Sequence, residues 1–337
     1  MRHLGVDFRS NNLVVCYLSE QGTQSFAKFQ LSEIERFQNQ LSKTDVVAVE
    51  ATANSRWFIK QIASYVERVE VVNPRQFEVI AKSVKKTDRA DAALLAEFSS
   101  KEMLPTVRQK TDAQAEVQSL CSLRTNLVEM RTALFNRMHA LVIGSGRQEA
   151  KRSVKSALGR KRLLAQVWTD LERIQLEIIS RQIAELDKSI EETEDVIAKA
   201  GEKLAGYENL LSIKGIGPQS AALLTAVIGD VADFETENKL ASYFGVVPSV
   251  SNSNQSVRHG RITKHGNKAA RTALLQCALV AKKFSQYLKQ FYESVKERRG
   301  AGKAKIALAR KFLVVIYHTL KNNWMFTDFT KFEKTEA

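Results

Sequence analysis

The sequence predicts an α/β domain at the N-terminus, then a helical insert, then a basic and mostly helical C-terminal domain. Short β-branched runs bounded by polar residues are concentrated before about residue 110 and alternate with helical patterns. Residues 106–217 contain no proline, the strongest helix breaker, so nothing there opposes long helices. A length of 337 residues with 44% hydrophobic side chains allows two or three domains with separate cores. We therefore expect three parts: 1–110, 111–205 and 206–337.

The first part is expected to follow the order βββαβαβα. A helix should begin at Ser32, because Glu35 three residues later completes the form of a capping box. A later helix should begin near Asp88. The expected strands span residues 3–8, 13–18, 25–31, 45–50 and 69–72, with a helix over 55–65.

The second part carries a heptad-like apolar seam and a basic run. The seam would be buried in a helical hairpin, in a dimerising coiled coil, or by one amphipathic helix packing on its own chain. Residues 147–162 hold seven basic residues and one acid, which indicates either a solvated face or a phosphate contact. The seam residues are Leu176, Ile179, Ile183, Leu186, Ile190, Thr193 and Ile197.

Charge distribution points to a nucleic-acid partner. The chain has 51 Lys and Arg against 37 Asp and Glu, a net charge of +14 and a pI near 9.6. No acid occurs between Glu237 and Glu293, where nine cations lie. Neutralising phosphates with such a segment releases counterions, so affinity should fall steeply with salt. The nine are Lys239, Arg258, Arg261, Lys264, Lys268, Arg271, Lys282, Lys283 and Lys289.

The three cysteines, Cys16, Cys121 and Cys277, lie far apart without a CxxC pair, which argues against a disulfide framework and a thiolate zinc site. The start of the chain lacks the apolar stretch of a signal peptide, and no run of about 18 apolar residues occurs. We expect a cytoplasmic, nucleoid-associated protein that does not enter a membrane.

Four carboxylates are candidates for a metal site. Asp7 lies near the end of the first expected strand and Glu50 ends the fourth, while Asp88 and Asp91 share one face of a helix start. The first and fourth strands of such a sheet are commonly neighbours, so the four acids could converge and bind two Mg²⁺ ions for phosphoryl transfer. Taken singly, Asp7 reads as a turn former, Asp88 as an N-cap and Asp91 as a solvated side chain. Glu50 favours the metal, because its strand is very apolar and burial without a partner is costly.

Two blocks of motifs occur along the chain: LGVD (4–7), VEAT (49–52), VNP (72–74) and KTDRADA (86–92), then IKGIG (213–217), FGVVP (244–248) and GRITKHGNK (260–268). Together they resemble one transposase family, that of insertion sequence one-hundred-and-ten, which includes the Piv pilin-gene invertases. The resemblance implies an RNase H-like (RuvC-like) N-terminal domain in which Asp7, Glu50, Asp88 and Asp91 form a DEDD tetrad that binds Mg²⁺, with Mn²⁺ as a substitute.

The resemblance also implies a serine nucleophile a few residues after the Gly-x-x-Pro of the second block. The matching position is Ser253, although Ser251 and Ser256 are close and the choice among them stays open. The family usually has Ser-Gly where this chain has Ser253-Asn254, and asparagine tolerates a positive φ next best. A serine that attacks a phosphodiester keeps the DNA end attached, so strands can be rejoined without ATP.

The segment Lys214–Pro218 resembles the hairpin of a helix-hairpin-helix element, whose glycines and following helix N-terminus could accept a phosphate. An ordinary glycine-rich turn is the alternative. The expected nucleic-acid contacts are Lys214, Gly215, Gly217, Arg258, Arg261, Lys264, Lys268 and Arg271.

We therefore expect a metal-dependent DNA recombinase that cleaves and rejoins strands of double-stranded donor and target DNA. The resemblance implies a structured non-coding guide RNA and assembly as dimers or tetramers through the coiled coil. Two alternatives remain at this point: a RuvC-like Holliday-junction endonuclease that uses water, and a non-catalytic nucleic-acid-binding protein.

Overall fold

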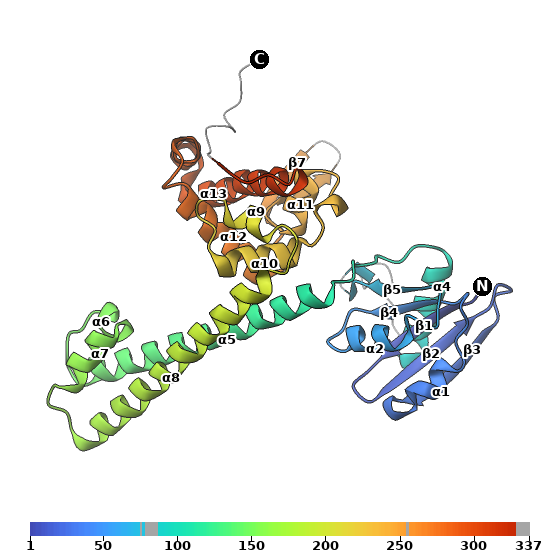
Figure 1. Cartoon of the computed structure of the whole chain (residues 1–337), viewed down its shortest axis with the longest axis horizontal. Coiled ribbons are helices and arrows are strands. Elements are labelled where there is room, and N and C mark those ends of the chain that lie inside the picture. Colours follow the sequence, from blue (N-terminus) through green and yellow to red (C-terminus); the bar gives the residue numbers. More distant parts are fainter. Residues whose placement is uncertain (75, 78–86, 254–255, 328–337) are drawn as a thin grey trace, which may run out of the picture. The chain divides into compact units, whose positions relative to one another are not determined.

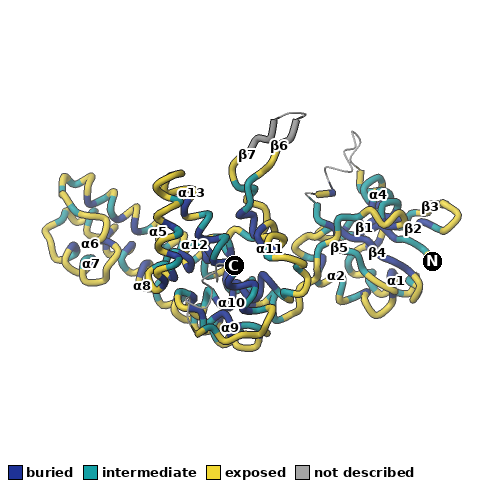
Figure 2. Tube along the Cα trace, turned by 90° about the horizontal axis from the view of Figure 1, so that it is seen from above, coloured by how far each residue is buried: buried dark blue, intermediate teal, exposed yellow. Residues whose placement is uncertain are grey.

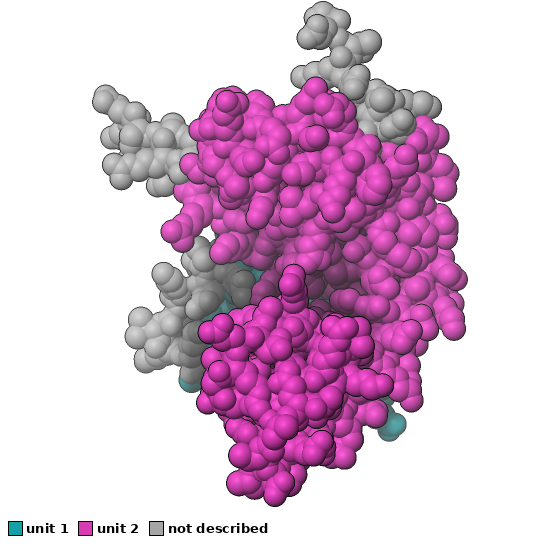
Figure 3. Space-filling view, turned by 90° about the vertical axis from the view of Figure 1, so that its left-hand side faces the viewer, with its two compact units in different colours: residues 1–109 teal, residues 110–337 magenta. Residues whose placement is uncertain are grey.

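The computed structural model describes residues 1–74, 76–77, 87–253 and 256–327, and the chain divides into two compact units. Figure 3 shows these units, Met1–Gln109 and Lys110–Ala337, in different colours. The first unit is α/β, and the second is built mainly of helices. No helix within the described ranges combines the length and the hydropathy that crossing a membrane requires.

The first unit is built on a five-stranded mixed sheet in the order β3-β2-β1-β4-β5. Strands β1, β2 and β3 pair antiparallel, while β4 lies parallel to β1 and β5 parallel to β4. Each strand expected from the sequence is present, with bounds shifted by at most one residue, which confirms the α/β prediction for this region. The strands are β1 His3–Phe8, β2 Asn12–Leu18, β3 Gln24–Gln30, β4 Val46–Glu50 and β5 Arg68–Val72.

The helices of this unit cover both faces of the sheet. One face carries α1 (Ile34–Gln38) and α2 (Ser55–Ile62), where Phe58 stacks with Phe8 of β1 and with Phe37 of α1 in a buried cluster. The other face carries α4 (Asp88–Ser100), which buries Ala92, Leu95 and Ala96 against the strands. Because successive side chains of a strand point to opposite faces of the sheet, every second residue of these strands faces α4.

The predicted capping box at Ser32 and Glu35 is wrong. The box forms two residues earlier, where the Gln30 amide N–H donates to Glu33 Oε2 over 2.8 Å, and it begins a 3₁₀ turn, Leu31–Glu33, ahead of α1. Ser32 is already inside this turn, because strand β3 ends at Gln30 and leaves that residue extended at the N-cap.

In the second unit, α5 (Asp112–Gly144) and α8 (Asp170–Gly201) form an antiparallel helical hairpin with α6 (Lys151–Lys155) and α7 (Ala157–Leu164) at its far end (Figure 1). Both long helices begin with capping boxes, at Thr111 and Thr169. The chain's own α5 covers the predicted α8 seam, of which every member except half-buried Leu186 is buried. Of the alternatives, the structure therefore supports the hairpin.

The rest of this unit packs around α10, in which residues 221–228 are all buried. A two-stranded hairpin, β6–β7, stands away from these helices in Figure 2. The long α13 is broken at Gly300, whose φ of 80° and ψ of 160° are not helical. The elements are α9 Tyr207–Leu211, α10 Pro218–Ile228, the 3₁₀ turn Val231–Asp233, α11 Glu237–Tyr243, β6 Pro248–Ser253, β7 Ser256–Ile262, α12 Lys268–Ala281 and α13 Gln286–Lys321.

Candidate functional site

The predicted acids of the first unit lie toward the same end of the sheet, near the carboxyl ends of β1 and β4. Val6 pairs with Val49, so Asp7 and Glu50 follow at the same level of neighbouring parallel strands. Leu4, Val6 and Phe8 belong to the core under α1 and α2, so the alternate residue Asp7 is on the face that α4 covers. Glu50 shares that face, because Ala48 two residues earlier packs with Leu95 of α4.

The first turn of α4 brings the other two carboxylates to this face. Thr87 is the N-cap, and its Oγ1 accepts the Ala90 N–H over 3.2 Å. Asp88 is therefore not the cap, contrary to the single-residue interpretation, and its side chain is available for other partners. Asp88 and Asp91 lie in the first turn, where the positive end of the helix dipole favours negative charge.

Arg9, which sequence analysis did not single out, connects two of these acids. Its guanidinium pairs with Asp7 Oδ2 over 3.4 Å and also contacts Asp88 Oδ1. The Arg9 side chain is 57% exposed, whereas those of Asp7 and Asp88 are 22% and 33% exposed. A cation thus already bridges a strand-end acid and the first turn of α4. The spacing of two residues between Asp7 and Arg9 was an available signal for their pairing, but not for the contact of Arg9 with Asp88.

The charged side chains around Asp7 shift the pKa of its carboxyl group. Burial raises the pKa of Asp7 above its ordinary value, and the nearby carboxylates of Asp88 and Asp91 raise it further, while Arg9 opposes this shift. Three carboxylates within electrostatic reach of one another favour a bound cation. Glu50 is half-buried at the same edge.

The donor chemistry of this cluster fits a hard divalent ion, because carboxylate oxygens are the ligands that Mg²⁺ prefers and a guanidinium already lies between two of them. In the part of the chain that the structure describes, no three His, Cys, Asp or Glu side chains converge closely enough to form a ready-made metal cage. The carboxylates are therefore of the type that Mg²⁺ prefers, and Arg9 is the counter-ion of two of them, Asp7 and Asp88.

The candidate nucleophile lies in the second unit. Strand β6 ends at Ser253, whose register partner on β7 is Ser256, and Ser251 pairs with Arg258. The side chains of residues 251–259 lie outside the described part of the structure. The backbone therefore places Ser253 at the last paired position of a hairpin, while the choice among the three serines stays a prediction.

The predicted cations of this block divide into two kinds. Arg261, Lys264 and Lys268 are exposed. Arg271 instead points into the fold, where its guanidinium donates to the carbonyls of Phe244 and His265 over 3.2 and 3.0 Å. Arg271 thereby joins the two loops that flank the β6–β7 hairpin, a role that composition alone did not indicate.

In the glycine-rich turn that was predicted to bind phosphate, one of the two glycines, Gly215, is required by packing. Gly215 has a φ of 109°, and a Cβ there would lie 2.7 Å from the Ala281 nitrogen, so close packing on α12 accounts for this glycine. Gly217 is the N-cap of α10 and has open space around it, and Lys214 is exposed. Lys214 and Gly217 are therefore the members of this turn that a ligand could reach.

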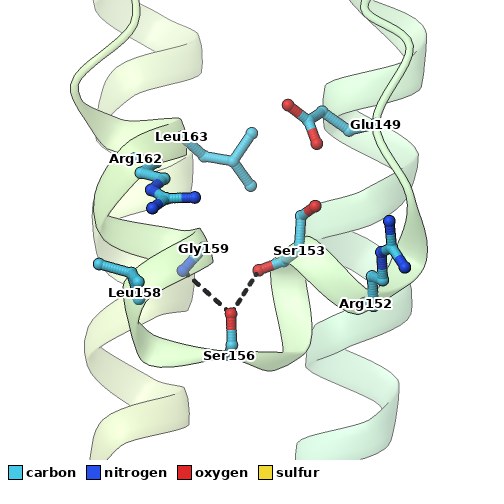
Figure 4. Close-up of a pocket in the computed structure, with 8 residues that line it drawn as sticks. All are labelled: Glu149, Arg152, Ser153, Ser156, Leu158, Gly159, Arg162 and Leu163. Atoms are coloured by element: carbon cyan, nitrogen blue, oxygen red, sulfur yellow. Dashed lines mark hydrogen bonds between the residues drawn. The ribbon is translucent and has the colours of Figure 1, made fainter.

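The basic run 147–162 is partly structural. Arg147 stacks on Trp168 with 3.6 Å between its Cζ and the ring centroid, and buried Arg160 pairs with Asp187 over 3.3 Å. A pocket of about 360 Å³ lies between α6 and α7, where Ser156 Oγ accepts the Gly159 N–H (Figure 4). Glu149 shares this lining with Arg152 and Arg162, so the pocket is not purely cationic.

Comparisons with known proteins agree with the two motif blocks. Residues 4–144 match a family model described as "Transposase" (DEDD_Tnp_IS110), and residues 207–293 match one described as "Transposase IS116/IS110/IS902 family". A transposase for insertion sequence element IS1111A from Coxiella burnetii is 27% identical, over 94% of this chain and 89% of the relative. The pilin gene-inverting protein of Moraxella lacunata is 28% identical, over 95% and 96%. A probable family 20 transposase from Pseudomonas aeruginosa is 26% identical, over 82% and 83%.

Proposed function

The chain belongs to the IS116/IS110/IS902 family of transposases, and on this basis we propose that it cleaves and rejoins DNA strands with a carboxylate metal site and a serine nucleophile. The observation that carries the proposal is the placement of Asp7 and Glu50 on the face of the sheet that α4 covers, together with the Arg9 bridge from Asp7 to Asp88 in the first turn of α4. The strand order β3-β2-β1-β4-β5 supports an RNase H-like fold for this unit.

Asp7, Glu50, Asp88 and Asp91 are the residues that would hold the metal, which we propose to be two Mg²⁺ ions, with Mn²⁺ as a substitute. When bound, the ions would neutralise charge on the attacking and leaving oxygens of the phosphodiester. The chain's own contribution is to fix these acids on β1, β4 and α4, and to supply Arg9 as a counter-ion at the same edge.

In the proposed reaction, Ser253 Oγ forms a bond to phosphorus and the bond from phosphorus to the 3′ oxygen breaks. The serine proton leaves with a base, and the departing 3′ oxygen takes up a proton. The resulting phosphoserine keeps the DNA end attached until the 3′ hydroxyl of a new strand attacks the same phosphorus and releases the serine.

The partners follow from the same proposal. Double-stranded donor and target DNA are the substrates, and a structured RNA from the same element selects them, consistent with the net charge of +14. Because α5 occupies the α8 seam, assembly into dimers or tetramers needs another face. Leu171, Ile174 and Ile178 of α8 provide one, since they are 74%, 52% and 46% exposed at helical spacing.

The test uses a plasmid that carries the DNA flanking the gene, together with RNA that co-purifies with the protein. The wild type should join strands and form a covalent protein–DNA adduct in Mg²⁺ or Mn²⁺, and EDTA should abolish both. Asp7→Ala should remove all cleavage. Ser253→Ala should remove the adduct and joining, whereas Ser249→Ala, an exposed serine on the same strand, should not.

Each alternative predicts a different result. If Ser253→Ala, Ser251→Ala and Ser256→Ala all continue to cut, water is the nucleophile and the protein is an endonuclease. If Asp7→Ala leaves the wild-type reaction unchanged, the carboxylate site is not catalytic. If only Ser251→Ala or Ser256→Ala loses the adduct, the nucleophile is reassigned within the same hairpin.

A further inference from the structure

A cationic groove lies at the foot of the β6–β7 hairpin, between its strands and the broken helix α13. It has a volume of about 960 Å³. We define it by its six basic residues: Arg261, Lys264, Arg298, Arg299, Lys303 and Arg310.

The charge of this groove is not balanced by the protein. No acidic residue is among those that line it, and over the described ranges none of its six cations forms an ion pair. Arg310 donates to the Asn238 side-chain oxygen and Arg298 to the Ser294 carbonyl, both neutral partners. Six cations gathered around one hollow repel one another, and a polyanion would relieve that repulsion.

The groove also has an apolar floor, and this feature favours a single nucleic-acid strand over other polyanions as its ligand. Val246, Ile262, Val295 and Ile306 contribute to it. A DNA duplex presents mainly phosphates and sugars to a protein and would leave such a floor unused. An unstacked base instead presents an apolar face, and guanidinium planes can stack on it.

The break in α13 places basic residues from both of its segments in the groove. Arg298 and Arg299 precede Gly300, whereas Lys303, Ile306 and Arg310 follow it. Gly300 has a backbone conformation that is essentially restricted to glycine, so the bend is fixed by the sequence at this point.

We propose that the cationic groove binds a single strand of the DNA being recombined, with its phosphates on the six cations and one or more unstacked bases on the apolar floor. This assignment rests on the proposed function, in which Ser253 attacks that DNA. Strand β7 runs from Ser256, opposite Ser253, to Arg261 in the groove, a span of about 17 Å at the usual strand rise. The groove would therefore hold the strand a few nucleotides from the cut.

The experiment compares two double variants on the same helix in the full-length protein. Arg299→Ala/Lys303→Ala removes two groove cations, and Lys296→Ala/Lys305→Ala removes two exposed cations of α13 that do not line the groove. Binding of a fluorescent 20-nucleotide DNA strand, its duplex and an RNA strand of the same sequence is measured by anisotropy over a range of salt.

The groove variant should lose more affinity for the DNA strand than for the duplex or the RNA strand. The groove variant should lower the slope of log affinity against log salt by about 1.4, because each lost contact to a single strand contributes about 0.7. The control variant should leave the slope nearer that of wild type. A strand with abasic sites should bind about fivefold more weakly than the intact strand to wild type, because bases contribute through stacking.

Equal loss in both double variants, or a loss in the groove variant that is as large for the duplex or the RNA strand as for the DNA strand, would overturn the groove assignment. Strand joining, measured in parallel, separates this assignment from the proposed function. If the wild type joins strands while the groove variant binds the DNA strand normally, only the groove assignment fails. If no joining occurs but the groove variant selectively loses the strand, the groove assignment holds and the recombination chemistry is refuted.

Discussion

Replacing Gly5 with alanine is expected to push α4 away from the sheet and to displace the two aspartates of its first turn. Gly5 lies on β1, on the same face as Asp7, and α4 packs directly on it. A Cβ at Gly5 would lie 1.9 Å from the Ala92 carbonyl oxygen and 2.5 Å from the Ala96 nitrogen. Both are backbone atoms of a helix, so no side-chain rotation relieves the overlap.

The size of the effect follows from this overlap. An ordinary contact needs at least 3.4 Å, so the 1.9 Å contact requires a shift of about 1.5 Å between helix and strand. Overpacking of this kind costs about 1–3 kcal/mol in the free energy of unfolding. Misplacement of catalytic groups by about 1 Å can reduce the rate by about 100-fold. The variant should therefore lose activity out of proportion to its loss of stability.

Hydrogen exchange of a peptide covering α4, followed with increasing urea, measures the stability, and the plasmid joining assay measures activity. Gly22→Ala is the control, because a Cβ at Gly22 would have no atom within 4 Å, so that alanine is disfavoured there only by the backbone φ of 82° and not by contact with a helix. That variant should lose some stability and keep joining activity. A Gly5→Ala protein with wild-type exchange at α4 and wild-type joining would refute the packing argument.

Three further outcomes are expected. Burial raises the pKa of Asp7 above its ordinary value of 3.8, so the folded protein loses stability relative to the unfolded chain as pH rises above that value and Asp7 ionises. The free energy of unfolding of Asp7→Asn, measured by urea titration in EDTA, should therefore increase relative to wild type over this pH range. A difference between the two proteins that stays constant with pH would contradict the raised pKa. Arg160→Ala should lose about 2 kcal/mol in the free energy of unfolding, the range of a hydrogen bond to a charged group, because Arg160 is buried against Phe135 and pairs with the partly exposed Asp187. Residues 150–165 should then become open to protease, whereas the exposed Arg162→Ala should leave them protected. The buried thiols of Cys16 and Cys121, with pKa values raised to about 11, and of Cys277 should react with a thiol reagent at pH 8 only after denaturation; labelling of the folded protein would refute their burial.

The strands of the first unit were predictable because they combine β-branched residues, or in β3 aromatic residues, with polar boundaries. Residues 45–50, for example, were expected as a strand and form β4, Val46–Glu50. The position of the capping box was not predictable from the sequence, because Gln30 and Ser32 each have a Glu three residues later. The end of strand β3 at Gln30, a tertiary feature set by pairing with β2, decides between them.

The acids at the sheet edge could be found from sequence because strand periodicity and the i, i+3 spacing in α4 fix their faces. The bridging role of Arg9 could not, since it depends on how closely α4 approaches the end of β1. The heptad pattern of α8 predicted a buried seam but not its partner, because a seam is compatible with any apolar helix. Arg298, Arg299 and Lys303 were missed because Glu293 and Glu297 interrupt the acid-free segment.

The bend at Gly300 has a consequence for how this protein can diversify. A Cβ at this position would meet no atom within 4 Å, so a model of steric fit alone would accept alanine or serine there. The dihedral angles of 80° and 160° exclude them, since only glycine adopts that region without strain. In a library randomised at codon 300 and selected for recombination, glycine should be retained even though its surroundings are empty.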